Sequence, residues 1–158
     1  EGAGMARALA AVRPPERRLT LRRAGGILIL DDCYNANPES MAAALDTLAE
    51  LDVRRRIGVL GDMLELGAAS RDAHRELGAR AARVLDRLYL IGEEAETVAG
   101  AARAAGMAPP AILVSADREA LVREVLRDLA PGDGLLVKAS RAVGLEAVVE
   151  AVMRRERS

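Results

Sequence analysis

Seven consecutive residues, 31–37, carry a high density of groups that could bind a polar ligand. They read Asp-Asp-Cys-Tyr-Asn-Ala-Asn, and Pro38 follows them. A carboxylate at the end of a strand can accept both hydroxyls of a ribose, and an asparagine amide can pair with a base edge or position a phosphate. Two plainer roles stay open: Asp31 could simply end a strand, and Asn37 before a proline is typical of a helix N-cap.

Two later segments also carry polar or charged side chains, and the first of them has a glycine at each end. Residues 61–67 read Gly-Asp-Met-Leu-Glu-Leu-Gly, and residues 138–141 read Lys-Ala-Ser-Arg. Terminal glycines permit φ > 0 and close backbone approach, so the first segment is a shaped loop rather than a linker. Its Met63 and Leu64 could also fold back onto the core.

Lys138 is the one lysine among 23 basic residues, and all the others are arginine. A compact ammonium on a flexible stem can approach a carboxylate or an acyl phosphate where a planar guanidinium would clash. We therefore expect Lys138 to have a role in a ligand pocket. The alternative is an ordinary residue at a strand end.

Other chemistry is poorly supported by the residues present. His74 lies on the apolar stripe of a predicted helix, which favours a packed, hydrogen-bonded side chain over a ligand. Cys33 has no cysteine or histidine near it in sequence and is expected to be a small buried residue. One histidine and one cysteine cannot supply the usual zinc ligands, so we expect no metal site. The chain also lacks a G-x-x-x-x-G-K-[ST] phosphate loop.

These polar segments follow short, continuous apolar runs that are typical of strands buried on both faces. The runs are 27–30, 57–60, 88–91, 112–114 and 135–137. Helical stripes with i, i+3, i+4 spacing alternate with them, at 41–51, 74–85, 121–129 and 145–152. Residues 93–105 form a weaker helical segment that ends at Gly106. Asn37, Ser70 and Asp117 are candidate helix caps.

Alternating strands and helices predict an α/β fold: a Rossmann-like, doubly wound, mostly parallel sheet of about six strands flanked by helices. A strand near residues 19–22 could form an antiparallel hairpin through Gly25 and Gly26. Ligands of such sheets bind at the carboxyl ends of the strands, where the polar segments lie. Residues 4–12 could end a helix, and Pro14-Pro15 would interrupt it, so the main domain is expected over 19–158 after a linker.

Composition excludes several classes of protein. Tyr34 and Tyr89 are the only aromatic residues and the net charge is −1, which argues against a nucleic-acid partner. No apolar run approaches the roughly 20 residues that span a bilayer, so we expect no membrane insertion. A single cysteine favours a reducing compartment and a cytoplasmic location.

The three polar segments, taken with their flanking residues, resemble the Mur ligase family. The matching stretches are 31–41, 60–67, 70–75 and 137–141, in this order, within roughly residues 19–153. The first two are specific to the branch that joins D-alanyl-D-alanine to a UDP-N-acetylmuramoyl tripeptide. The branches that add alanine, glutamate or diaminopimelate differ there.

The resemblance implies a three-domain ATP-dependent ligase of peptidoglycan precursor synthesis. The first domain binds the UDP-sugar, the central one carries the phosphate loop, and the third closes over ATP and brings the amino substrate. With Mg²⁺, the enzyme makes an acyl phosphate from the tripeptide carboxylate, which the dipeptide amine attacks. This chain would be the third domain, inactive alone, with residues 1–18 as the end of the central domain and its linker. ATP and Mg²⁺ would be held mainly by the central domain.

Matched by motif, Asp32 corresponds to the acid that contacts the ribose, with Tyr34, Asn35 and Asn37 near the ATP. Lys138 is the expected catalytic residue. The residues expected on the D-alanyl-D-alanine side are Asp62, Met63, Leu64, Glu65, Ser140 and Arg141. The sequence departs from the family pattern at Cys33, at Ala139 and at Ala142-Val143, and a methyl group at position 139 would narrow the backbone approach to a ligand.

One alternative keeps the fold and changes the function to a non-enzymatic receiver or small-ligand module. A flavodoxin-like receiver also has acids after its first strand and a lysine after a late one, as Asp31, Asp32 and Lys138 do. Its phosphorylated aspartate would follow a further strand, where this chain has Asp62. The long matches at 31–41 and 60–67 favour the ligase.

Overall fold

The computed structural model describes residues 19–158, so the predicted helix tail and linker at 1–18 lie outside the described residues. Six strands form one sheet in the order β1-β2-β6-β3-β4-β5. β1 runs antiparallel to β2, and the other neighbouring pairs are parallel. The strands are β1 (Thr20–Ala24), β2 (Ile27–Asp32), β3 (Arg56–Leu60), β4 (Arg87–Leu90), β5 (Ile112–Val114) and β6 (Gly134–Lys138). This confirms the predicted fold class, including the hairpin.

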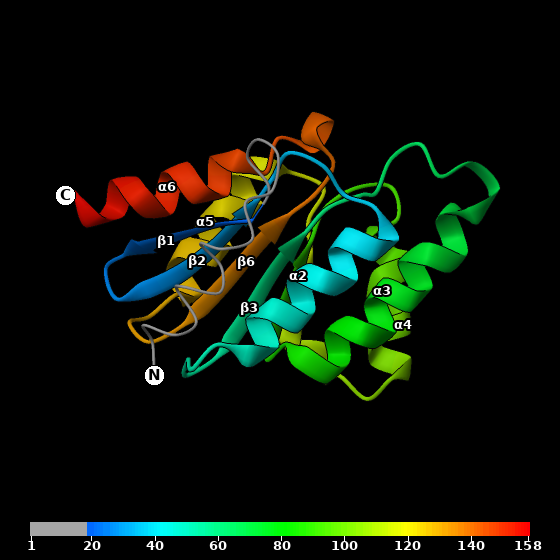
Figure 1. The fold of residues 1–158 in the computed structure, drawn as a ribbon, viewed down its shortest axis with the longest axis horizontal. Helices are drawn as coiled ribbons and strands as arrows, with labels where there is room; N and C mark the ends of the chain where they lie inside the picture. Colours follow the sequence, from blue (N-terminus) through cyan, green and yellow to red (C-terminus); the bar gives the residue numbers. More distant parts are fainter. Residues whose placement is uncertain (1–18) are drawn as a thin grey trace.

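Among residues 19–158, five α-helices cover the two faces of the sheet (Figure 1). α2, α3 and α4 pack side by side on one face, and α5 and α6 pack on the other. Their bounds are α2 (Pro38–Glu50), α3 (Ser70–Val84), α4 (Ala95–Ala104), α5 (Arg118–Asp128) and α6 (Glu146–Glu156). Short 3₁₀ turns lie at η1 (Gly67–Ala69), η2 (Pro109–Ala111) and η3 (Arg141–Val143).

The hydrophobic core is divided by the sheet into two clusters. Successive residues of a strand point to opposite faces, so Leu136 of β6 packs with the α2–α4 cluster, while Leu135 and Val137 pack with the α5–α6 cluster. Every residue of β6 is buried. The same alternation directs Lys138 toward the α2 face, together with Asp32 at the end of β2.

Two of the three predicted helix caps are confirmed. The Asn37 side chain accepts the Ser40 N–H, and the Ser40 hydroxyl accepts the Asn37 N–H, which forms a capping box. Asp117 caps α5 through the amides of Glu119 and Ala120. The expectation for Ser70 is wrong: it is the first residue of α3, because the η1 turn leads directly into the helix with helical backbone.

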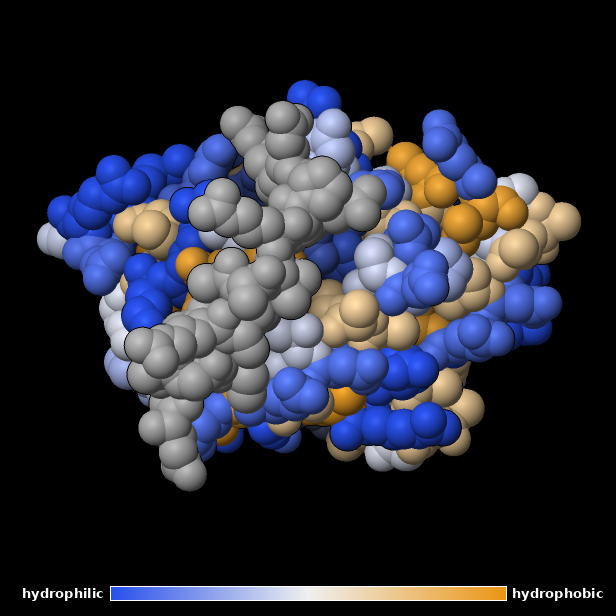
Figure 2. Space-filling view, in the orientation of Figure 1, coloured by the Kyte–Doolittle hydropathy of each residue, from blue (hydrophilic) through white to orange (hydrophobic). Residues whose placement is uncertain are grey.

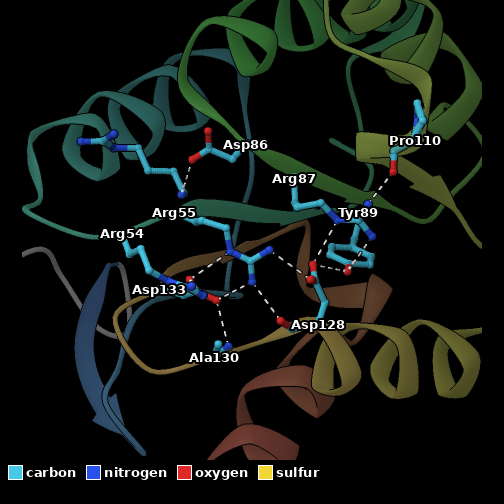
Figure 3. Close-up of polar contacts among 10 residues, drawn as sticks. Arg54, Arg55, Asp86, Arg87, Tyr89, Pro110, Asp128, Ala130 and Asp133 are labelled. Atoms are coloured by element: carbon cyan, nitrogen blue, oxygen red, sulfur yellow. Dashed lines mark hydrogen bonds and ion pairs between the residues drawn. The ribbon is translucent and has the colours of Figure 1, made fainter.

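A polar network ties the elements together at the amino edge of the sheet, opposite the polar loops (Figure 3). Arg55 joins the carboxylates of Asp133 and Asp128, and Asp128 also accepts the Tyr89 hydroxyl at 2.7 Å. Burial alone would raise the pKa of Asp133, but hydrogen bonds from Arg55 and the Ala130 amide outweigh it and lower that pKa. Burial raises the pKa of Tyr89 to about 12. Within 19–158, no helix is both long and apolar enough to cross a membrane.

Candidate functional site

The loops after β2, β6 and β3 meet at the carboxyl edge of the sheet. β6 lies between β2 and β3, and its register sets Lys138 beside Asp32 on one side and Leu60 on the other. The segments 31–37, 61–67 and 138–141 therefore form one continuous region, although they are far apart in the sequence (Figure 1). This is the edge at which ligands of parallel α/β sheets bind.

Lys138 and Asp32 form a buried ion pair at the centre of this region. The Lys138 ammonium donates to Asp32 Oδ2 at 2.6 Å and to the Asn35 carbonyl at 2.8 Å, and the lysine is only 1% exposed. Asp32 Oδ1 is buried and has no hydrogen-bond partner in the described part of the chain. An unmatched carboxylate oxygen is costly in a protein interior, and it is suited to accept a hydrogen bond from a ligand hydroxyl.

The rest of the first loop is only partly directed at a ligand. The Asn35 side chain accepts the Ala36 N–H, and the Asn37 side-chain oxygen caps α2, as the plainer interpretation of Asn37 expected. Tyr34 is 44% exposed, and the guanidinium of Arg141 lies 5.6 Å from the centre of its ring. Cys33 is buried, as expected. Burial is the main cause that raises the pKa of its thiol, and the negative charge of the nearby Asp31 raises it further, so Cys33 is an inert core residue.

The carboxylate of Asp62 binds backbone rather than pointing to solvent. It accepts the amides of Glu93 and Glu94 at 2.8 and 3.1 Å, and it is buried. No side chain of the loop after β4 caps α4. The Asp62 carboxylate, which lies in the neighbouring loop 61–67, stabilises the first turn of α4 instead. Gly92 makes this possible, since its φ is +124° and a Cβ there would overlap the Asp62 carboxylate.

The loop 61–67 is bound to the last loop by hydrogen bonds to the backbone and the side chain of Ser140. The Ser140 amide donates to the Asp62 carbonyl at 3.0 Å, and the Leu64 amide donates to the Ser140 hydroxyl at 2.9 Å. Met63 is buried, as one interpretation of the sequence expected, but Leu64 is 43% exposed. Figure 2 shows hydrophobic surface over this loop, between β3 and α3. Glu65 is also exposed and has a φ of +62°.

Ala139 does not narrow a ligand site, contrary to the expectation from the sequence. It is fully buried, and a Cβ built on Gly61 would overlap its methyl group and that of Val143. The methyl group therefore points into the interior, where Gly61 makes room for it.

One further side chain, His74, contacts the loop 61–67. Its ring is buried, and Nε2 lies 3.1 Å from the Met63 amide nitrogen. The sequence indicated only a packed, hydrogen-bonded histidine, which is confirmed. Its partner could not be identified from the sequence, because the stripe that includes His74 gives the face of the helix and not the loop that covers it.

The comparisons with known proteins agree with this arrangement. Residues 17–141 match the family model described as Mur ligase, glutamate ligase domain. The chain is 41% identical to the UDP-N-acetylmuramoyl-tripeptide–D-alanyl-D-alanine ligase of Synechocystis over 80% of its own length and 28% of that protein. It is 35% identical to the ligase of the same name from Mycobacterium tuberculosis strain H37Rv, over 94% of this chain and 33% of that one.

Among solved structures, the fold is similar to a MurF ligase from Thermotoga maritima in complex with ADP. The TM-score is 0.78 at 34% identity, and the match covers 95% of this chain and 34% of that one. The chain thus spans about a third of the length of these relatives. The chain belongs to the Mur ligase family and corresponds to the C-terminal domain of these ligases.

Proposed function

We propose that this chain is the ATP-closing and amino-substrate domain of a ligase that joins D-alanyl-D-alanine to UDP-N-acetylmuramoyl tripeptide. The observation that carries the proposal is the buried pair of Asp32 and Lys138, which unites the nucleotide motif and the last loop at the carboxyl edge. The relatives named above bear this activity in their names. A cytoplasmic location follows from the use of ATP and nucleotide-linked substrates.

On the nucleotide side, Asp32 is the proposed acceptor for a ribose hydroxyl. Its Oδ1 lacks a donor in the described residues, while Oδ2 is held by Lys138. A ribose has two hydroxyl groups that can donate hydrogen bonds, and one of them could supply the donor that Asp32 Oδ1 lacks. Tyr34, with its exposed ring beside Arg141, and the adjoining Asn35 and Asn37 complete the proposed nucleotide side. The neighbour crystallised with ADP supports the use of ATP by the whole ligase.

On the dipeptide side, Leu64 and Glu65 present the exposed surface of the loop 61–67. Asp62, Met63 and Ser140 hold that loop in place through the hydrogen bonds described above. Lys138 is the proposed catalytic cation, and Arg141 is the proposed partner for a dipeptide carboxylate. An arginine suits that task because its planar fork matches a carboxylate.

The proposed reaction transfers the γ-phosphoryl group of ATP to the tripeptide carboxylate, with release of ADP. The dipeptide amine then attacks the acyl phosphate carbon and phosphate leaves, forming the peptide bond. The domain contributes by holding the amine donor near the activated carboxyl, which makes a bimolecular step effectively unimolecular. Residues 19–158 contain no cluster of three or more side chains that could hold a metal ion. We therefore assign Mg²⁺ and the phosphates to the rest of the ligase.

The receiver alternative is less well supported. A receiver needs an aspartate that can reach a phosphoryl donor, but the Asp62 carboxylate is buried and accepts two backbone amides. Acetyl phosphate should therefore leave the chain unmodified. Phosphorylation of Asp62, detected by mass spectrometry, would favour the receiver instead.

The direct test uses the full-length protein and the isolated 158-residue chain side by side. With UDP-N-acetylmuramoyl tripeptide and ATP, the full-length protein should release ADP over many turnovers only when D-alanyl-D-alanine is added, and the product should gain the mass of the dipeptide less one water. The isolated chain should release none, because it contains no phosphate loop. Dipeptide-dependent ADP release by the isolated chain would contradict this division of labour.

A further inference from the structure

His74 lies behind the loop 61–67, outside the residues to which a ligand role has been assigned. Its Nδ1 lies 2.7 Å from the Ser70 carbonyl oxygen, one turn earlier in α3, and 3.3 Å from the Ser70 hydroxyl, which can share the same hydrogen. Its Nε2 lies 3.1 Å from the Met63 amide nitrogen. The ring is 1% exposed, and Met63 is buried as well. Both ring nitrogens therefore have partners in a place that solvent does not reach.

The two partners assign the state of the ring. A carbonyl oxygen only accepts, so Nδ1 must carry the hydrogen, and an amide N–H only donates, so Nε2 must offer its lone pair. Only the neutral ring with the hydrogen on Nδ1 satisfies both contacts. Both ring nitrogens are thus held by partners within the protein, which favours a holding role for His74.

The hydrogen bond from the Met63 amide to His74 attaches the loop 61–67 to α3, whereas two other hydrogen bonds of the loop attach it to the end of β6. Gly61 donates to the Lys138 carbonyl, and Leu64 donates to the Ser140 hydroxyl, so both of these bonds run to the end of β6 and its loop. Between them, Met63 donates to α3 through His74. The exposed residues Leu64 and Glu65 follow directly, with Glu65 in the left-handed region of the backbone.

We propose that His74 is a positioning residue that sets the loop 61–67 for the incoming dipeptide. This inference rests on the proposed function of the loop. Without an acceptor at Nε2, the Met63 amide would be buried and unpaired, and the loop would have to move to hydrate it. Such a movement would shift Leu64 and Glu65, whereas Asp32 and its contacts on β2 and β6 would keep their places.

Three variants of the full-length ligase separate this role from packing. His74→Gln can place its side-chain oxygen near the position of Nε2, whereas His74→Asn is too short to reach it, and His74→Leu has no acceptor. We expect Asn and Leu to raise the apparent KM for D-alanyl-D-alanine at least about tenfold, which corresponds to about 1.4 kcal/mol. Gln should stay within about threefold of the wild type, and KM for ATP should change less than about twofold in all three.

A truncation at the far end of the same helix, Val84→Ala, is the matched control, because Val84 is partly buried and packs against the core. It should lower the thermal midpoint and leave both KM values unchanged. Equal dipeptide kinetics in His74→Gln and His74→Asn, or an equal rise in both KM values, would overturn the proposal. A wild-type ligase without dipeptide-dependent ADP release would instead contradict the proposed function itself.

One measurement does not depend on any variant folding. Residues 1–158 contain a single histidine, so segmental ¹⁵N-histidine labelling of this part of the full-length ligase reports the two ring nitrogens of His74 alone. The proposal requires hydrogen on Nδ1 and a lone pair on Nε2 at the pH of the assay. A ring with hydrogen on Nε2 would overturn it.

Discussion

The ammonium nitrogen of Lys138 lies 2.6 Å from Asp32 Oδ2, and both side chains are almost fully buried. Attraction between unit charges is strong where solvent is excluded, but each charge has lost its hydration, so the pair depends on both members. Removal of one leaves the other charge buried without compensation. Substitutions at either position must therefore be assessed for stability and for kinetics together.

Asp32→Asn in the full-length ligase should raise the apparent KM for ATP by about ten- to a hundredfold, the value of a hydrogen bond to a charged group. The thermal midpoint should also fall, because Lys138 loses its counter-charge. Lys138→Met, measured beside it, separates the two effects. If ATP kinetics stay unchanged in Asp32→Asn while stability falls, Asp32 is only the partner of Lys138.

Lys138→Arg should lower kcat/KM for the dipeptide by at least about tenfold, or about 1.4 kcal/mol. The ammonium fits between Asp32 Oδ2 and the Asn35 carbonyl, where a larger planar guanidinium would have to displace one of them. Arg103→Lys is the control, since Arg103 lies on α4 and pairs only loosely with Glu96 at 3.8 Å. If neither substitution changes kcat/KM for the dipeptide, Lys138 has no role in the dipeptide pocket.

Gly78→Ala and Gly100→Ala should have opposite effects on stability. Both glycines lie in helices, but a Cβ on Gly78 would overlap the Val98 carbonyl of α4, whereas a Cβ on Gly100 meets nothing within 4 Å. Alanine at position 100 should stabilise the chain by about 0.5–1 kcal/mol, because it restricts the unfolded chain and favours helix. Alanine at 78 should force α3 and α4 apart and destabilise. Urea denaturation of both variants measures the difference, and equal shifts would show that α3 and α4 do not pack this closely.

Asp133→Asn should destabilise the chain in a pH-dependent way. Asp133 is fully buried and pairs with Arg55, so its loss should cost about 2 kcal/mol near neutral pH. Its pKa is lowered from the usual value of 3.8, so its stabilisation is complete above that value and is lost as the pH falls through the lower, folded-state pKa.

The gap in unfolding free energy between wild type and Asp133→Asn should therefore be widest at pH 6–7 and narrow below about pH 4. Urea denaturation at several pH values measures it. Asp72→Asn is the matched control, because Asp72 is exposed and its 3.5 Å pair with Arg75 should contribute less than about 0.5 kcal/mol. A gap that does not change with pH would show that the Asp133 charge is not what stabilises the network.

The sequence by itself determined the elements of this fold and the edge at which its polar loops gather. Each apolar run from 27–30 to 135–137 became a strand, and the α2 and α5 stripes became helices capped by Asn37 and Asp117. These features depend on neighbours within a few residues, since period and capping are local properties of the chain. Parallel alternation then brings the carboxyl ends of the five parallel strands, β2 to β6, to one edge.

The tertiary structure alone decided which of those groups meet. Asp32 and Lys138 are 106 positions apart, and they pair because β6 inserts between β2 and β3, a strand order that no local pattern encodes. The same packing brings the Asp62 carboxylate within hydrogen-bond distance of the amides of Glu93 and Glu94, and it brings the His74 ring to the Met63 amide. Strand order is selected by burying apolar surface over the whole chain, so these long-range contacts follow from the complete core and not from any single segment.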